Sequence, residues 1–334
     1  YPALAVAEQI VERRPDAGIH FLCSMRPVDR RILDRTDFPY TELPATGLYF
    51  DPRRLAAFGL TFCQSYRLAR CLIAGSPHAV VVGAGGFVAA PVCMAGHKLG
   101  VPVALVNVES ARRFNTRRAK IATVGCPLRR DFARPDRTRA IESLGLDASR
   151  KVLLITGASS GSMRINEAVC MLLPRLDAFA DAWQIVHLTG LDNYEQVVQG
   201  YEGARIRHKI VSYYDRMPDL LAAADLLVGR SGAVSVAEYA VAGVPSICMP
   251  YPHHKDRHQY LNAGRLVEVG AAVIVDDVSD ADDRAAWLWE ELESLLRDDV
   301  TRSEMAAACK LVAKPNAASD IAERLIALAE RSGA

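Results

Sequence analysis

The segment Arg230–Glu238 has the residue types and spacing of a phosphate-binding turn. The apolar run Leu226–Val228 predicts a strand, which a Gly-Arg-Ser-Gly turn separates from a predicted helix over 233–243. Such a turn directs several free backbone N–H groups, and the positive end of the helix dipole, toward one point. A pyrophosphate fits that point. Glu238 lies one turn into the helix, where its carboxylate could accept hydrogen bonds from the two vicinal hydroxyls of a ribose.

A second polar segment, His254–Gln259, follows the predicted strand Ser246–Pro250 and is predicted to be a loop. Its amide and charged groups suit the hydroxyls of a sugar. His253, His254 and His258 could also be interpreted as a metal cluster, but a solvated loop is favoured and no metal is expected. A glycine turn before a helix is common in α/β proteins. The prediction of a nucleotide-sugar site therefore rests on the two segments together, because they follow successive strands of the same α/β unit in this order.

Composition limits the class of protein. The 334 residues suit two domains of about 150 residues each, and half of them are hydrophobic. No apolar run is long enough for a membrane-spanning helix. The eight cysteines are scattered without a CxxC pair, which indicates reduced thiols in a cytosolic protein. Residues 1–135 carry a formal charge of +9 and the remainder −8. The basic half indicates either an anionic partner, such as a phosphate-bearing substrate or a lipid surface, or a solvated face.

Predicted strands alternate with predicted helices, which is typical of parallel sheets covered by helices. We therefore expect an α/β protein with two doubly wound domains, divided by a hinge at Gly125–Arg129 into residues 1–124 and 125–315. Ligands bind at the carboxyl ends of the strands in such domains. Because glycine turns follow several strands there, the cleft between the domains is the predicted site. The predicted strands are Ile19–Cys23, Ala79–Val82, Val101–Val106, Val152–Ile155, Trp183–Leu188, Ile206–Val211, Leu226–Val228 and Ser246–Pro250.

Two features of the amino-terminal half indicate whether the sequence is a fragment and whether the protein contacts a membrane. A helix is predicted over 2–13, whereas a doubly wound domain normally begins with a strand and a glycine-rich turn, so we expect the sequence to be a fragment. The stretch Leu43–Phe50 is predicted to be irregular, with Tyr49 and Phe50 exposed. The basic amphipathic helix predicted over Arg53–Ile73 either packs against the core or lies on an anionic bilayer.

The order of these motifs resembles the MurG family, bacterial transferases that move N-acetylglucosamine from UDP onto the muramyl-pentapeptide diphospho-undecaprenol lipid (lipid I to lipid II). The resemblance covers almost the whole chain. It implies the GT-B architecture, with the final helix (316–334) returning to the amino-terminal domain. It implies a peripheral protein on the cytoplasmic face of the cell membrane. The implied partners are UDP-N-acetylglucosamine, an undecaprenyl-linked acceptor and an anionic inner-membrane surface, with no nucleic acid and no cofactor. The matching motifs are Tyr1–Ala7, Gly85–Val88, Gly125–Arg129, Gly157–Gly161, Arg230–Glu238, Ala242–Pro245 and Pro252–Asn262.

The resemblance also implies roles for donor-site residues. Arg129 and Ser159 would contact the diphosphate of the UDP-sugar, and the fork of a guanidinium matches phosphate oxygens. The helix start over the diphosphate would consist of Ala233, Val234, Ser235 and Val236. The other implied contacts are Tyr214 for uracil, Glu238 for the ribose, and His258 and Gln259 for sugar hydroxyls.

The resemblance assigns fewer residues to acceptor binding and to the catalytic base. The favoured base of the family is a histidine just before the position of Tyr1, which this sequence does not contain. An acidic residue that follows a family strand aligns with Glu109, the catalytic candidate here. The chain around 122–123 is shorter than the family pattern by a strand and a loop. The turn implied to receive the acceptor diphosphate comprises Gly85, Gly86 and Phe87.

The implied reaction is an inverting, metal-independent hexosyl transfer. A base would remove the proton of the acceptor 4-hydroxyl, and the oxygen would attack the anomeric carbon in line with departing UDP. The helix start and Arg129 would stabilise the leaving diphosphate. Three alternatives stay open: a related transferase with another lipid acceptor, a UDP-sugar 2-epimerase, and a non-catalytic nucleotide-sugar binder. A Rossmann dehydrogenase is disfavoured because Gly83–Gly86 lacks an acidic residue about 20 positions on.

Overall fold

The computed structural model describes residues 1–47, 51–76, 79–106, 122–133, 135–157, 161–253 and 256–332. The chain forms two compact units. Unit 1 comprises Tyr1–Arg129 together with Asn316–Ala334, and unit 2 comprises Arg130–Pro315. The sequence predicts the division after residue 124, five residues before this point. The last segment of the chain thus belongs to the same unit as the first.

Unit 2 is built on a six-stranded parallel sheet, which confirms the predicted α/β class. Its strand order is β10-β9-β8-β5-β6-β7, so β5 lies between β8 and β6. The central strands are fully buried, as continuous apolar runs in a parallel sheet require, with Val152–Ile155 at most 1% exposed. The strands are β5 (Lys151–Thr156), β6 (Trp183–Leu188), β7 (Arg207–Val211), β8 (Leu226–Gly229), β9 (Ser246–Cys248) and β10 (Ala272–Ile274).

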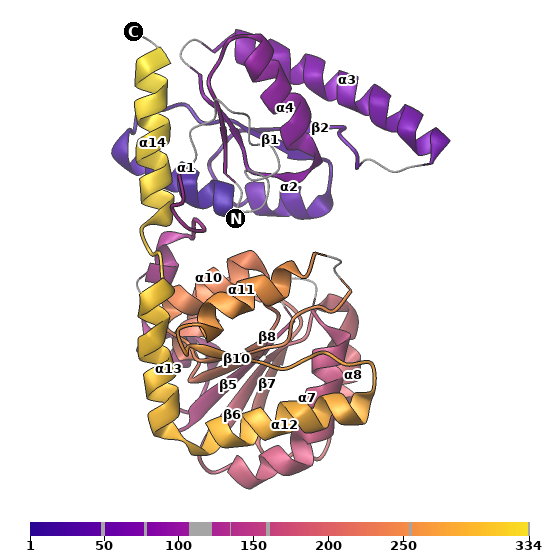
Figure 1. The fold of residues 1–334 in the computed structure, drawn as a ribbon, viewed down its shortest axis with the longest axis vertical. Coiled ribbons are helices and arrows are strands. Elements are labelled where there is room, and N and C mark those ends of the chain that lie inside the picture. The colour runs from indigo at the N-terminus through magenta and orange to yellow at the C-terminus, as the bar shows by residue number, and fades with distance from the viewer. Residues whose placement is uncertain are drawn as a thin grey trace. The chain divides into compact units, whose positions relative to one another are not determined.

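Helices cover both faces of this sheet (Figure 1). On one face α7 contacts α8 and α12, and on the other α9, α11 and α13 gather around α10. The first group packs the main core, in which Ile165, Leu172 and Leu288 are buried against the strands. The helices are α6 (Arg137–Leu144), α7 (Met163–Leu176), α8 (Tyr194–Gly200), α9 (Met217–Ala223), α10 (Ala233–Ala242), α11 (His258–Val267), α12 (Ala281–Arg297) and α13 (Asp299–Val312), with 3-10 turns at Arg130–Ala133, Asp177–Phe179 and Leu191–Asn193.

Unit 1 has two parallel strand pairs, β1 with β2 and β3 with β4. Its carboxy-terminal helix α14 packs on α1 through Val6, Ile321 and Leu325 (Figure 1). An ion pair of 2.7 Å between Arg14 and Glu330 supplements this contact. The elements are α1 (Pro2–Arg13), β1 (Phe21–Ser24), α2 (Pro27–Leu33), β2 (Tyr40–Leu43), α3 (Pro52–Ala74), β3 (Val81–Gly83), α4 (Gly86–Lys98), β4 (Val103–Leu105) and α14 (Ala317–Ser332). No helix in the described part of the chain is long and apolar enough to cross a membrane.

Several local predictions are wrong. Tyr40–Leu43 forms β2, which is not predicted because a half-buried four-residue strand has no clear periodicity; residues 44–47 of the stretch predicted to be irregular form neither a helix nor a strand. Residues 48–50, which include Tyr49 and Phe50, lie outside the described residues. The polar segment predicted as a loop runs into α11, which begins at His258. Its first turn is polar and hides the helical pattern. β10, α6 and α13 are not predicted at all.

A buried polar chain anchors α7 to β6. His187 on β6 is fully buried and lies with Nε2 3.0 Å from Asn166 Oδ1 and Nδ1 2.9 Å from Tyr201 Oη. Asn166 Nδ2 donates to the carbonyl of Thr189 at 3.0 Å. Burial lowers the pKa of His187 to about 3, because a charged imidazolium would lose its hydration there. The folded protein therefore keeps His187 neutral, donating to Asn166 and accepting from Tyr201.

This burial predicts an acid-labile unit 2. The unfolded chain takes up a proton on His187 below about pH 6.5, whereas the folded chain does not until about pH 3. The free energy of unfolding should therefore decrease as the pH falls through this window, by at most about 1.4 kcal/mol per pH unit from this group. All three tryptophans lie in unit 2, so urea unfolding followed by their fluorescence measures it. His187→Gln should reduce the pH slope, and an identical slope in both proteins would contradict the prediction.

Candidate functional site

The carboxyl edge of the unit 2 sheet has a topological switch point between β5 and β8. These strands are neighbours, with Ile155 opposite Val228 and Thr156 opposite Gly229. The chain leaves β5 toward β6 and leaves β8 toward β9, and the helices that follow, α7 and α10, lie on opposite faces. Adjacent strands whose connections diverge in this way leave a crevice beyond their carboxyl ends, where ligands of doubly wound proteins bind.

The α10 helix begins at this edge with unsatisfied donors. Its N-cap is Gly232, which offers no side-chain cap, and its first internal hydrogen bond runs from Val236 N to Gly232 O at 2.9 Å. The N–H groups of the preceding three residues, 233–235, have no acceptor within the helix. Ser231 is fully buried, and its Oγ has no hydrogen-bond partner among the described residues. The turn thus presents N–H groups that an anion could satisfy.

The turn after β5 is closed tightly by two glycines. A Cβ on Gly157 would lie 2.1 Å from the backbone nitrogen of Ser162. Gly161 has φ of 74°, and a Cβ there would lie 2.2 Å from the carbonyl oxygen of Thr189. The chain can therefore follow this path only with glycine at both positions. Ser159, between them, lies outside the described residues.

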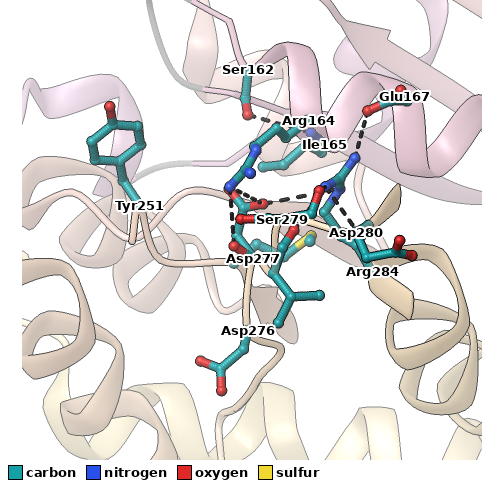
Figure 2. Close-up of polar contacts among 12 residues, drawn as sticks. Ser162, Arg164, Ile165, Glu167, Tyr251, Asp276, Asp277, Ser279, Asp280 and Arg284 are labelled. Carbon is teal, nitrogen blue, oxygen red and sulfur yellow. Dashed lines mark hydrogen bonds and ion pairs between the residues drawn. The ribbon is translucent and has the colours of Figure 1, made fainter. Parts of the chain in front are cut away.

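Arg230 joins the turns at this edge. Its Nη2 donates to Ser162 Oγ at 2.7 Å, and its Nη1 donates to Met249 O at 2.8 Å. Its guanidinium also pairs with the buried carboxylate of Asp277, and its carbon Cζ lies 5.6 Å from the centre of the Tyr251 ring. Figure 2 shows Ser162, Tyr251 and Asp277 in one close-up of this edge. One side chain thus connects the segments that follow β5, β8, β9 and β10.

The first turn of α11 adds polar groups to the same edge. Gln259 Oε1 accepts a hydrogen bond from Tyr251 N at 2.9 Å, which directs its Nε2 hydrogens to another acceptor. His258 Nδ1 lies 2.8 Å from Asp256 Oδ1, and the hydrogen bond from His258 lowers the pKa of Asp256 below its ordinary value. Arg257, at the N-cap, has φ of 48°, which is unusual for a residue other than glycine. Within the described residues, no group of three or more His, Cys, Asp or Glu could hold a metal ion.

The structure brings most of the predicted donor residues to one edge. Ala233, Val234, Ser235, Val236 and Glu238 lie in the first turns of α10, and His258 and Gln259 begin α11. Tyr214, which is half-buried, follows β7 at the same edge, two strands from β5.

The other predicted residues belong to unit 1 or lie outside the described residues. Arg129 belongs to unit 1, where its Cζ lies 5.0 Å from the Tyr1 ring centre. Gly85 and Gly86 have φ of 95° and 77°. α4 begins at Gly86, so Phe87, 42% exposed, lies in its first turn. Glu109, with the rest of residues 107–121, lies outside the described residues.

Comparisons with known proteins agree along the whole length of the chain. The glycosyltransferase family 28 C-terminal domain matches residues 152–325, and the family 28 N-terminal domain matches residues 1–110. Two relatives are both named UDP-N-acetylglucosamine--N-acetylmuramyl-(pentapeptide) pyrophosphoryl-undecaprenol N-acetylglucosamine transferase. The relative from Desulfitobacterium hafniense (strain Y51) is 30% identical over 96% of this chain and 94% of its own. That from Paenarthrobacter aurescens (strain TC1) is 33% identical over 97% and 92%.

The chain belongs to glycosyltransferase family 28.

Solved structures support the family 28 fold. A crystal structure of Acinetobacter baumannii MurG has a TM-score of 0.70 at 24% identity, covering 98% of this chain and 95% of that one. A UDP-GlcNAc 2-epimerase from Neisseria meningitidis, bound to UDP-GlcNAc, has a TM-score of 0.62 at 13% identity, covering 97% and 95%. The fold class is GT-B, with two Rossmann-like domains. Because the epimerase shares it, the fold by itself does not select the reaction.

Sequence reasoning missed the charged cluster of this family 28 site. Asp277 and its partners Arg164, Arg230 and Arg284 are not among the predicted site residues, although Arg230 begins the first motif. These residues are spread over 121 positions, and no spacing rule connects them. The only available signal was an Asp-Asp pair directly after the apolar run 271–275, at the carboxyl end of a strand.

The tight β5 turn predicts a strong effect of one added methyl group. Gly161→Ala should lower the free energy of unfolding by more than about 2 kcal/mol, because the left-handed backbone alone costs about 1–2 kcal/mol and the contact with Thr189 O adds to it. Gly203→Ala is the matched control, since Gly203 has φ of 82° and nothing within 4 Å of the added Cβ. Urea unfolding by tryptophan fluorescence measures both. Equal losses in the two variants would show that the contact with Thr189 contributes nothing.

Proposed function

We propose that this chain transfers N-acetylglucosamine from UDP-N-acetylglucosamine to the 4-hydroxyl of a muramyl-pentapeptide diphospho-undecaprenol lipid. The main support is the coincidence of two observations. The chain belongs to family 28 over nearly its whole length, with relatives that carry this activity in their names. The switch point of unit 2 also has an uncapped helix N-terminus of the kind that binds diphosphates.

The donor binds at the carboxyl edge of unit 2 in this proposal. The first N–H groups of α10 and the β5 turn, with Ser159, hold the diphosphate, and Glu238 accepts hydrogen bonds from the ribose hydroxyls. Tyr214 packs the uracil. Gln259 donates its free Nε2 hydrogens to a sugar hydroxyl, because its carbonyl oxygen is occupied by Tyr251 N. His258 contacts a neighbouring hydroxyl.

The transfer proceeds with inversion and without a metal ion. A base, for which Glu109 is the candidate within this sequence, takes the proton of the acceptor 4-hydroxyl. The oxygen forms a bond to the anomeric carbon while the bond from that carbon to the UDP oxygen breaks. The helix dipole of α10 and Arg129 stabilise the charge that develops on UDP. Gly85, Gly86 and Phe87, at the start of α4, receive the diphosphate of the acceptor.

The acceptor is a membrane lipid, so the protein must reach a bilayer surface. We place it at the cytoplasmic face of the cell membrane, as a peripheral protein. Helix α3 of unit 1 exposes leucines beside arginines: Leu60 is 67% and Leu68 is 47% exposed, and Arg67 and Arg70 are exposed on the same helix. Ser65, Ala69 and Ile73 form its buried side. A helix of this kind binds an anionic surface through its basic and apolar side chains.

Glu238 provides the direct test of donor binding. Glu238→Ala should weaken UDP binding to the full chain by about 10- to 100-fold, because hydrogen bonds to a charged group contribute about 1.5–3 kcal/mol. Isothermal titration calorimetry with UDP and 2′-deoxy-UDP measures the effect. The wild type should prefer UDP, and Glu238→Ala should bind both equally, with Glu238→Gln between them. An unchanged UDP affinity in Glu238→Ala would contradict the proposed contact between Glu238 and the ribose. UDP release from UDP-N-acetylglucosamine without lipid would favour an epimerase instead.

The membrane proposal predicts charge-dependent binding to vesicles. Arg67→Glu with Arg70→Glu should weaken sedimentation with phosphatidylglycerol vesicles by more than about 30-fold, since each basic residue near the surface contributes about 1 kcal/mol. Lys310→Glu with Lys314→Glu changes the net charge equally in unit 2 and serves as the control. Phosphatidylcholine vesicles should bind all proteins weakly. Equal loss in both double variants would assign the effect to net charge alone.

A further inference from the structure

Asp277 is a fully buried carboxylate between β10 and α12 (Figure 2). Three guanidinium groups from three different elements approach it. Arg230 Nη2 lies 2.7 Å from Oδ2, Arg164 Nη1 lies 3.2 Å from Oδ1, and Arg284 Nε lies 4.0 Å from Oδ1. The contact with Arg230 is an ion pair whose alignment does not make a hydrogen bond. A buried carboxylate is tolerated only when opposite charges compensate its lost hydration, which these arginines do.

Positive charge exceeds negative charge within this cluster. Arg284, 1% exposed, has a second acidic partner in Glu167 of α7 at 2.5 Å, and donates to the carbonyl of Val278 at 2.8 Å. Three guanidinium groups therefore share two carboxylates, one of them half-exposed. Arg164 also donates to the carbonyl oxygen of Asp277 at 3.2 Å. Removal of the Asp277 charge would leave Arg230, 7% exposed, without its anionic partner.

Through these arginines Asp277 acts on the turns of the proposed donor site. Arg230 directly precedes the turn into α10, and its own carbonyl accepts from Tyr239 Oη at 3.0 Å. Its guanidinium donates to Ser162, which is the N-cap of α7, and to Met249, the residue after β9. Arg164 lies in the first turn of α7. Both helix starts at the switch point are therefore fixed to one carboxylate.

We infer that Asp277 is a positioning residue for the diphosphate of the nucleotide-sugar donor, and that it acts through Arg230. The inference rests on the proposed function, because it takes the switch point as the donor site. Asp277 is buried below the turns and holds Arg230 in the orientation that sets the spacing of the α7 and α10 N–H groups. If Asp277 had a purely structural role, its substitution would change the stability of the protein. The contribution of the second phosphate to the affinity for UDP would then stay the same.

The test compares UDP with UMP, since only their affinity ratio isolates the second phosphate. In the full chain, Asp277→Asn should weaken UDP binding about tenfold or more in calorimetry and UMP binding clearly less, so that the ratio falls. Arg230→Met should lower the ratio similarly. The double variant Asp277→Asn with Arg230→Met should be no weaker than Arg230→Met alone, because the aspartate acts through the arginine.

A matched control and a milder variant complete the design. Asp225→Asn removes a carboxylate at the opposite edge of the sheet, where it pairs with Arg137 at 2.7 Å and accepts from Val152 N. It should lower stability and leave the UDP to UMP ratio unchanged. If Asp277→Asn does not fold, Arg164→Met removes an outer partner that is 24% exposed, and should lower the ratio about threefold.

The possible outcomes are distinct. Wild-type protein that binds no UDP would refute the proposed function. Wild-type protein that binds UDP, with an unchanged ratio in Asp277→Asn or in Arg164→Met, would overturn the inference and leave the function standing. Tighter UDP binding by Asp277→Asn would also overturn it, since the carboxylate would then compete with the diphosphate for Arg230. Multiplicative losses in the double variant would show that Asp277 does not act through Arg230.

Discussion

The divergence of α7 and α10 from two neighbouring strands is the constraint that organises unit 2. Because β5 and β8 pair in parallel and their helices cover opposite faces, both helix starts lie at one sheet edge. Positive dipole ends in that arrangement repel each other and favour an anion between them. Gly157, Gly161 and the N-cap Gly232 carry no side chains at this edge. The arrangement suits a diphosphate because the backbone supplies the donors.

Backbone N–H groups bind a diphosphate well only if their positions are fixed. The cluster of Asp277 with Arg164, Arg230 and Arg284 holds them in place. Arg230 donates its hydrogen bonds to protein groups, namely Ser162 Oγ and Met249 O. It therefore connects the turns to each other, and its buried positive charge lies close to them. The buried His187–Asn166 chain supports the same region from the other side, since Asn166 holds the carbonyl of Thr189 against which Gly161 packs. Two buried polar networks thus contact the described end of the β5 turn, at Gly161 and Ser162.

The sequence predicts the parts of the fold that local patterns determine. Apolar runs such as Trp183–Leu188 are strands with the predicted bounds, and the turn at Arg230 begins α10 as predicted. It fails where tertiary contacts decide. α11 is hidden because the polar first turn that carries Gln259 breaks the apolar period. The role of Asp277 is hidden because only the order of strands in the sheet brings it beside Arg164 and Arg230.

The chain enters unit 2 after Arg129 and returns to unit 1 at Asn316, and there its final helix packs on its first. During synthesis on a ribosome, all of unit 2 is therefore translated before Ile321 and Leu325, the residues that pack against Val6. The apolar side of α1 stays uncovered until α14 emerges from the exit tunnel. A premature stop near residue 316 would consequently damage the opposite unit from the one that had just been translated.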